Sequence, residues 1–354
     1  MRRSAPVILL VLLVTACGGQ SATSQASPSA ASSGSPPVSP VASPSPSPAP
    51  SSYVVVATPS TGATYTVNLL DAGGNLKGSA TAKGWNGSLT CAGVATALLP
   101  PPISTSNSKV YFEDSAGVVS FLSPDGTTGK ATTVPVGESR RSFFSVSPDD
   151  KRIAVVVSDF GANKASIRVY VENLTGGGNR VQIFTGSGAT SLWPVGWHAG
   201  SLVLAKVPAC IEGSAFGCCG PTELHVVNPA NGVRRFTIGG STCIVSGPST
   251  PSGTPCLTSS NVARVLDWAG VTTRTVQLPF KRLTYLSPDG QHLAYQTDGG
   301  TVVGGQTGPL QMGVCGWIDN THIVDSGHIG DITTGSVTQI TTAADCAGRI
   351  PGGL

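Results

Sequence analysis

The chain has 354 residues, with 21 Lys and Arg against 18 Asp and Glu, 45 Gly and nine Cys. Once Arg2 and Arg3 are set aside with the N-terminal segment, 19 basic residues stand against 18 acidic ones, a net charge near +1. Nucleic acid and anionic lipid recruit proteins through a basic surface, so this balance argues against both as electrostatically recruited partners. Charged residues are only 11% of the chain, and the many glycines favour strands joined by tight turns over long surface helices.

The first 16 residues have the pattern of an export signal. Arg2 and Arg3 precede an apolar run over residues 7–14, far shorter than the roughly 20 residues that span a bilayer as a helix. The run ends in Leu13-Val14-Thr15-Ala16-Cys17, which resembles the bacterial lipobox. The resemblance implies a lipoprotein signal peptide over residues 1–16 and lipidation of Cys17, with palmitate as an attached chain. The protein would then be anchored to the bacterial cell membrane, facing outside the cytoplasm. The alternative is an ordinary cleaved signal that happens to contain a cysteine.

A segment dominated by Ser, Pro and Ala follows this cysteine. Residues 18–52 contain no charged residue and approach their end in alternating Ser and Pro. Such a composition cannot bury enough apolar surface to offset its ordering entropy, so we expect a disordered linker over residues 17–52, beginning at the anchor cysteine. The prolines favour polyproline II at about 3.1 Å per residue, which gives this spacer a reach on the order of 100 Å.

The remaining residues, 53–354, alternate between β-rich runs and turns. In seven places a β-rich run is followed by turn residues in which Asn, Asp or Gly supplies the positive φ of a tight connection. These runs and turns are 65–70 with 71–74, 118–122 with 124–126, 167–171 with 176–178, 224–227 with 228–232, 262–266 with 267–270, 302–303 with 304–305, and 329–332 with 333–335. We interpret each as a β-hairpin.

A second kind of connection lies between these hairpins. Ser147-Pro148-Asp149-Asp150 precedes an apolar strand, and so does Ser287-Pro288-Asp289-Gly290. In both turns Pro presets φ at the first central position. Weaker versions stand at residues 196–200 and 316–320. Two hairpins per unit make four strands, and a repeat of roughly 30 to 55 residues is typical of propeller blades. We therefore predict an all-β fold, a β-propeller of four-stranded antiparallel blades, with seven blades expected and six or eight left open.

The Ser-Pro-Asp turns followed by an apolar strand resemble the WD-like repeat of TolB-type β-propellers. The resemblance extends over most of residues 53–341, and two units match its motif closely. Ser123-Pro124-Asp125-Gly126 has the same letters but falls in the second hairpin of its unit. The first unit begins at Tyr53 without an evident innermost strand. We expect the tail around Cys346 to close the ring against the first blade.

Eight cysteines follow the anchor, an even number in a chain exported to an oxidising compartment. They are Cys91, Cys210, Cys218, Cys219, Cys243, Cys256, Cys315 and Cys346. We interpret them as disulfide candidates, because the spacing fits a structural metal site poorly. Among 105 possible pairings, Cys243 with Cys256 would join neighbouring strands, and Cys210 with Cys218 or Cys219 would staple a protruding loop.

The sequence contains no evident catalytic or cofactor motif. His198, His292 and His322 fall at or just after turns, and a metal site at His322 and His328 would need a third ligand from another blade, so we expect no metal and no cofactor. The five Trp residues are expected to pack between blades; a ring of them exposed at the channel mouth would instead suggest a glycan platform. The loops over residues 208–222 and 247–255 are candidates for a recognition surface, or for decorations held by disulfides.

Two functional classes remain open. The first is a non-enzymatic binding or scaffolding module at the cell surface that recognises a protein, peptide or glycan. The second is an extracytoplasmic propeller enzyme with a site at the channel mouth. Propellers support both, so the fold does not choose, and the missing catalytic signature favours the binding module.

Overall fold

The computed structural model describes residues 51–58, 63–85, 87–90, 96–160, 166–209, 221–304, 308–340 and 344–354. The chain divides into two units, Met1–Ala49 and Pro50–Leu354, and the described residues all belong to the second. Every described strand, hydrophobic cluster and disulfide lies in the second unit, which therefore contains all that it needs to fold by itself. In the described ranges, no helix is long and apolar enough to cross a membrane.

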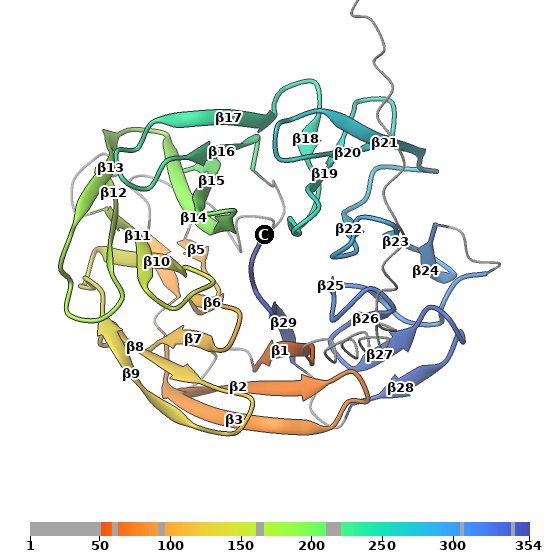
Figure 1. The fold of residues 1–354 in the computed structure, drawn as a ribbon, viewed down its shortest axis with the longest axis horizontal. Coiled ribbons are helices and arrows are strands. Elements are labelled where there is room, and N and C mark those ends of the chain that lie inside the picture. Colours follow the sequence, from red (N-terminus) through yellow and green to blue (C-terminus); the bar gives the residue numbers. More distant parts are fainter. Residues whose placement is uncertain are drawn as a thin grey trace, which may run out of the picture. The chain divides into compact units, whose positions relative to one another are not determined.

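The second unit is a ring of seven antiparallel sheets, the blades of a β-propeller, as the repeats predicted (Figure 1). Blade 1 contains β29 (Asp345–Ile350), β1 (Tyr53–Ala57), β2 (Thr64–Asp71) and β3 (Leu76–Lys83). Blade 2 contains β6 (Ile103–Thr105), β7 (Val110–Glu113), β8 (Val118–Leu122) and β9 (Thr128–Thr133). Blade 3 contains β10 (Arg140–Val146), β11 (Arg152–Asp159), β12 (Ser166–Asn173) and β13 (Val181–Ser187).

The other four blades continue around the ring in chain order. Blade 4 contains β14 (Thr190–His198), β15 (Ser201–Pro208), β16 (Glu223–Val227) and β17 (Arg234–Gly239). Blade 5 contains β18 (Ile244–Val245), β19 (Thr254–Leu257), β20 (Val262–Leu266) and β21 (Thr272–Gln277). Blade 6 contains β22 (Thr284–Leu286), β23 (Leu293–Thr297) and β24 (Gly300–Val303). Blade 7 contains β25 (Gly316–Trp317), β26 (His322–Val324), β27 (His328–Asp331) and β28 (Val337–Gln339).

Two local features differ from the predicted repeat. Blade 6 has three described strands rather than four, because Thr301 in β24 forms only an isolated bridge with Leu310 where a fourth strand would stand. The hairpin predicted there is described as far as Gly304, since residues 305–307 lie outside the described ranges. A separate two-stranded hairpin, β4 (Ser88–Thr90) with β5 (Thr96–Leu98), precedes blade 2 and was not predicted.

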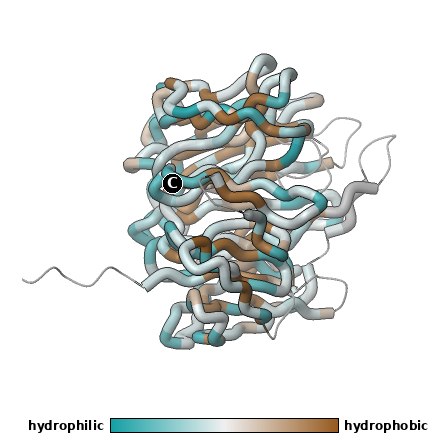
Figure 2. Tube along the Cα trace, turned by 90° about the vertical axis from the view of Figure 1, so that its right-hand side faces the viewer, coloured by the Kyte–Doolittle hydropathy of each residue, from teal (hydrophilic) through white to brown (hydrophobic). Residues whose placement is uncertain are grey.

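The burial of each strand follows its place in the blade. The second strand β11 is buried along nearly its whole length because neighbouring blades cover both of its faces, and its sequence is accordingly a continuous apolar run. The outermost strand β17 exposes its first four residues. Charged side chains on such outer strands, among them Arg234 and Lys77, discourage pairing with another chain at the open edge. Figure 2 shows the result, with hydrophobic segments inside and hydrophilic segments at the loops.

The ring closes through the last strand of the chain. β29 pairs antiparallel with β1, from Tyr53 opposite Ile350 to Ala57 opposite Asp345. It thus supplies the innermost strand of blade 1, which the first sequence repeat lacked. A disulfide joins Cys346 in β29 to Cys315, just before β25 in blade 7. The expected closure by the tail around Cys346 is therefore observed, and it is covalently tied to the last blade.

Both Ser-Pro-Asp turns join the first and second strands of their blades with the same hydrogen bonds. Ser287 Oγ donates to Asp289 Oδ1 at 2.6 Å and accepts from the His292 backbone N–H at 2.9 Å. Ser147 Oγ donates to Asp149 Oδ1 and accepts from the Arg152 N–H at the same two distances. The fourth turn residue has a positive φ, 76° at Gly290 and 60° at Asp150. Since successive innermost strands run the same way, these turns lie at one end of the channel, which we call the turn end.

Candidate functional site

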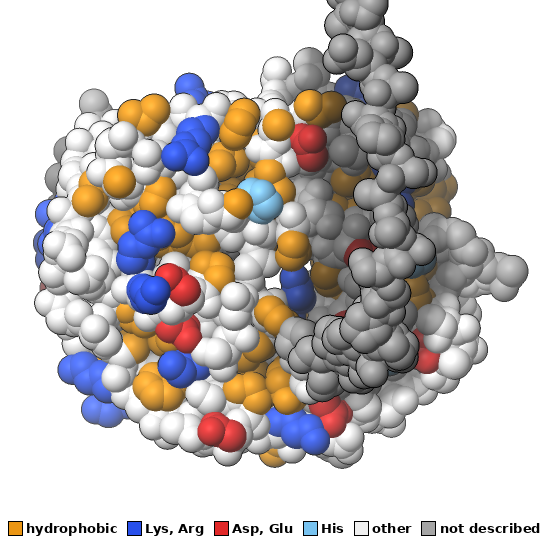
Figure 3. All heavy atoms as spheres, viewed as in Figure 1, with side chains coloured by type: hydrophobic (Ala, Val, Ile, Leu, Met, Phe, Trp, Pro, Cys, Tyr) orange, Lys and Arg blue, Asp and Glu red, His pale blue; other side chains and the backbone are white. Residues whose placement is uncertain are grey.

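The innermost strands surround a cavity of about 610 Å³ at the centre of the ring. Its wall comes from β29, β6, β10, β14, β22 and β25, and from residues 248–250 after β18. Every blade contributes, so residues far apart in the sequence face one space. Figure 3 shows the hollow in the middle of one face, with hydrophobic side chains and a Lys or Arg side chain at its edge. A volume of this size is typical of small-ligand sites.

Aromatic side chains build much of the cavity wall. Phe143 in β10 stacks on Trp193 in β14, with 4.1 Å between ring centroids and 18° between planes. Tyr285 in β22 is partly exposed, and Leu283, just before that strand, is 44% exposed. The cavity therefore offers an apolar surface to a bound molecule.

The tryptophans hold neighbouring blades together, as the packing interpretation expected. Trp197 Nε1 in blade 4 donates to the Ser145 carbonyl in blade 3 at 3.2 Å. Trp317 Nε1 in blade 7 donates to the Tyr285 carbonyl in blade 6 at 2.9 Å. No tryptophan is more than 8% exposed, so they form no exposed platform for a glycan; they are Trp85, Trp193, Trp197, Trp268 and Trp317.

Arg349 in β29 is the one Lys or Arg among the described residues that line the cavity. Within the described part of the chain, its guanidinium makes no hydrogen bond and no ion pair. Burial lowers the pKa of Arg349 to about 10, although the negative charge of Asp319 partly opposes this change. The side chain is still protonated at neutral pH, so the cavity contains a full positive charge.

The last residues of the chain cross the turn end of the channel. The Gly352 N–H donates to the Ser106 carbonyl and the Leu354 N–H donates to the Trp197 carbonyl, both at 2.8 Å. His198 Nδ1 lies 2.6 Å from the Leu354 carbonyl oxygen, and its ring stacks on Trp268 at 4.6 Å. The tail thus ties β29 to blades 2 and 4, and Figure 1 shows the C-terminal end near the centre of the ring.

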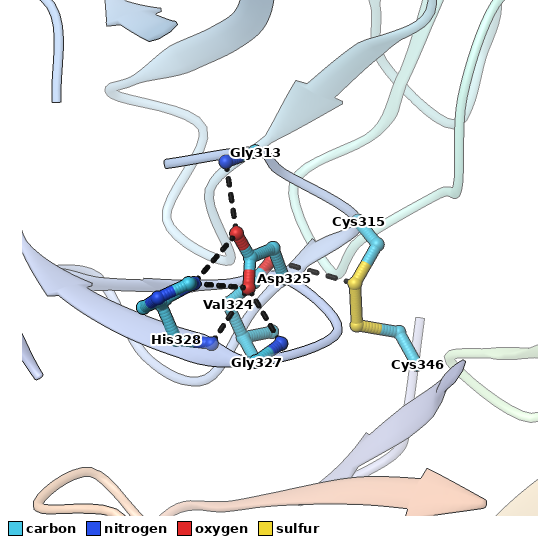
Figure 4. The surroundings of a disulfide bond; sticks show 7 residues. All are labelled: Gly313, Cys315, Val324, Asp325, Gly327, His328 and Cys346. Atoms are coloured by element: carbon cyan, nitrogen blue, oxygen red, sulfur yellow. Dashed lines mark hydrogen bonds and ion pairs between the residues drawn. A yellow bond between two sulfur atoms is a disulfide. The ribbon is translucent and has the colours of Figure 1, made fainter. Parts of the chain in front are cut away.

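The Cys315–Cys346 disulfide, which we call the seam disulfide because it joins the last blade to the closing strand β29, also lines the cavity. Figure 4 shows its surroundings. Beside it, Asp325 accepts hydrogen bonds from the backbone N–H groups of Gly313, Gly327 and His328 at 2.8, 2.7 and 2.6 Å. His328 Nδ1 lies 3.2 Å from Asp325 Oδ1. These contacts join the segment before Cys315 to the turn between β26 and β27, so the carboxylate has a structural use.

The cysteines predicted to form disulfides are placed only in part. Cys243 pairs with Cys256, the neighbouring-strand pairing that the sequence suggested, and Cys315 pairs with Cys346. Cys17, Cys91, Cys210, Cys218 and Cys219 lie outside the described residues, as does most of the loop over residues 208–222. Residues 248–250 of the second candidate loop line the cavity, so that loop belongs to the channel wall.

The histidines are spread over separate local contacts rather than gathered. His322 Nδ1 lies 2.9 Å from Asp319 Oδ2, and His225 Nε2 lies 2.8 Å from Glu223 Oε1 on blade 4. Among the described residues, no three His, Cys, Asp or Glu side chains are grouped so as to hold a metal ion.

Two features of the site were not predicted from the sequence. Arg349 follows Ala347 and Gly348 in a tail segment without alternation, and only the pairing of β29 with β1 turns it towards the channel. The position of the Leu354 side chain against β14 depends on Gly196, since a Cβ there would overlap that side chain and displace it. A lone charge within an otherwise uncharged run of small residues was the available signal for Arg349.

The sequence matches no known family profile and no curated protein sequence. Similar solved structures include the mitotic checkpoint complex, at 14% identity, 71% of this chain, 63% of that chain and a TM-score of 0.35. A prolyl endopeptidase structure is similar at 14% identity over 81% of this chain and 40% of that chain, with a TM-score of 0.45. BamB from Moraxella catarrhalis is similar at 13% identity over 84% of this chain and 82% of that chain, with a TM-score of 0.38. The chain spans less than two thirds of the length of the first two. Similarity at this level carries no argument about what the chain binds or does.

Proposed function

We propose that this chain is a bacterial lipoprotein whose TolB-type propeller serves as a binding module outside the cytoplasm, with its ligand in the central channel. In this proposal residues 1–16 are the signal peptide, Cys17 carries the lipid, and residues 17–52 separate the propeller from the membrane. The ligand is a protein, peptide or glycan, or a small part of one. The proposal rests on the cavity of about 610 Å³, to which every blade contributes and whose wall is mostly apolar.

The anchor is tested by labelling the producing bacterium with an alkyne analogue of palmitate. The wild-type chain should take up the label and fractionate with membranes, while Cys17→Ser should remain unlabelled and lose its membrane association. An unlabelled wild-type chain would contradict the lipoprotein proposal. This test leaves the channel unaltered, so it examines the membrane anchor independently of ligand binding.

The binding site is tested by blocking the channel. Leu283 lines the cavity and is 44% exposed, so Leu283→Trp should narrow the channel without disturbing the core. Leu76→Trp is the matched control, because Leu76 is 57% exposed on the outermost strand β3 of blade 1. Residues 50–354, immobilised and exposed to an envelope extract, should retain a component that Leu283→Trp loses and Leu76→Trp keeps. Retention that is equal in all three proteins would place the ligand elsewhere.

A further inference from the structure

Arg141 is the buried arginine of the propeller and its guanidinium has partners, in contrast to that of the partly exposed Arg349. Arg141, 5% exposed, donates to the carbonyls of Gly137, Glu138 and Arg140 at 2.7 to 3.2 Å. A cation in a desolvated position is costly unless hydrogen bonds or an anion compensate it. Within the described residues Arg349 has neither, although it lines the central cavity.

The acidic groups nearest to Arg349 leave its guanidinium free for an external anion. Asp319 already accepts hydrogen bonds from the backbone N–H groups of Thr321 and His322 at 2.8 Å and lies 2.9 Å from His322 Nδ1. Asp345 is the acidic residue in the cavity wall, but it stands four positions earlier in β29, about 13 Å along an extended strand. Neither carboxylate forms an ion pair with Arg349 among the described residues, although the charge of Asp319 acts on it, so the guanidinium can pair with an anion in the cavity.

The rest of the cavity fits an apolar molecule. Partly or largely exposed hydrophobic side chains line this cavity: Leu283 and Tyr285 from blade 6, Val195 from blade 4 and Leu354 from the tail. A mostly apolar wall with a few placed polar groups, among them a charged group that fixes the orientation, is the usual composition of a small-ligand site. Here that group is a cation, which pairs most strongly with a carboxylate or a phosphate.

We propose that the channel binds a molecule with an apolar body and a single carboxylate or phosphate group, and that Arg349 pairs with this anionic group. The inference rests on the proposed function, since it names the chemistry of a ligand for the same channel. It assigns the affinity to two separable parts, the apolar wall and the positive charge of Arg349.

Two fluorescent probes with the same aromatic body separate these parts. Anilinonaphthalene sulfonate carries one negative charge, and N-phenyl-1-naphthylamine is its uncharged counterpart. Both should bind residues 50–354. Arg349→Gln should weaken binding of the sulfonate about tenfold or more and leave the neutral probe unchanged. Arg349→Lys should keep most of the sulfonate affinity. Arg264→Gln is the control, because Arg264 is exposed on β20 outside the cavity, and it should change neither probe.

A measurement on the unaltered propeller covers the case in which Arg349→Gln does not fold. Decanoate should displace the neutral probe at least tenfold more tightly than decanamide, which has the same chain without the charge. Decyl phosphate, compared with decanoate, distinguishes a preference for phosphate from one for carboxylate. Equal displacement by decanoate, decyl phosphate and decanamide overturns the inference, as does sulfonate binding that Arg349→Gln leaves intact.

The outcomes also separate this inference from the proposed function. If Leu283→Trp abolishes binding of the neutral probe while charge has no effect, the channel binds ligands but Arg349 does not select anions. If Leu283→Trp changes neither probe, the channel is not the binding site and both proposals fail.

Discussion

The disulfide that closes the ring should contribute more to stability than the one within blade 5. The Cys315–Cys346 bridge joins residues 31 apart, and the chain-entropy model gives about 3.7 kcal/mol for a loop of this length at 25 °C. The Cys243–Cys256 bridge spans 13 residues, for which the same model gives about 2.9 kcal/mol. The first bridge also joins blade 7 to β29, so its loss should free the seam of the ring. We therefore expect the difference between the two to exceed about 0.8 kcal/mol.

The assay compares two double variants of residues 50–354, Cys315→Ser with Cys346→Ser and Cys243→Ser with Cys256→Ser. Urea unfolding gives the free energy of each, and hydrogen exchange reports the amide protection of β29 and β1. The seam variant should lose more stability and also lose protection in β29, whereas the blade 5 variant should keep that protection. An equal or smaller loss in the seam variant, with β29 still protected, would refute the reasoning that the bridge secures the closure.

Three further predictions concern single side chains. Ser287→Ala should cost about 1–2 kcal/mol in urea unfolding, because Ser287 is fully buried and the part-buried His292 N–H loses its acceptor. Ser123→Ala, whose hydroxyl makes no hydrogen bond among the described residues, should cost almost nothing. Burial and the negative charge of Asp114 hold the pKa of Glu113 well above its usual value, while the positive charge of Arg141 partly opposes them. Protonation of Glu113 therefore stabilises the folded state below the unfolded pKa, and this contribution is lost as the pH rises through the folded pKa. Glu113→Gln should therefore raise the free energy of unfolding at pH 8 by roughly 1–3 kcal/mol and the melting temperature by a few degrees, and the gain should shrink towards pH 4.5. A gain that is constant with pH would contradict this cause. Gly196→Ala should displace the Leu354 side chain, so hydrogen exchange at Leu354 should increase while the melting temperature barely changes; an unaltered rate would show that the tail adapts.

The sequence revealed those parts of the fold that local chemistry determines. Ser287, Pro288, Asp289 and Gly290 form a self-contained turn, in which the serine, the aspartate and the positive φ of glycine satisfy one another within six residues. The hairpin turns are equally local: Asp267 Oδ1, for example, accepts from two backbone N–H groups within the next four residues. Counting the recognised turns therefore led to an expectation of seven blades, with six or eight left open.

The channel wall could not be predicted in this way, because it depends on contacts between distant residues. β29 pairs with β1 across nearly 300 residues of sequence, and its own letters, Asp-Cys-Ala-Gly-Arg-Ile, show no alternation that marks a buried face. The stack of Phe143 on Trp193 likewise joins two blades. A register shift recurs between the third and fourth strands of five blades, from Leu69/Leu70 to Val265/Leu266, and no single residue type accompanies it.

The last strand, β29, thus has three structural roles within six residues. β29 supplies the innermost strand of blade 1, Cys346 ties it to blade 7, and Arg349 brings the cation into the channel. Closure and ligand chemistry are therefore coupled, because anything that loosens β29 also moves Arg349 relative to the wall formed by the other six blades. A substitution at Arg349 that reduced stability as much as loss of the seam disulfide would weaken both probes together, since it would open the ring. Only a loss confined to the charged probe, with β29 still protected from exchange, isolates the guanidinium as the ligand's partner.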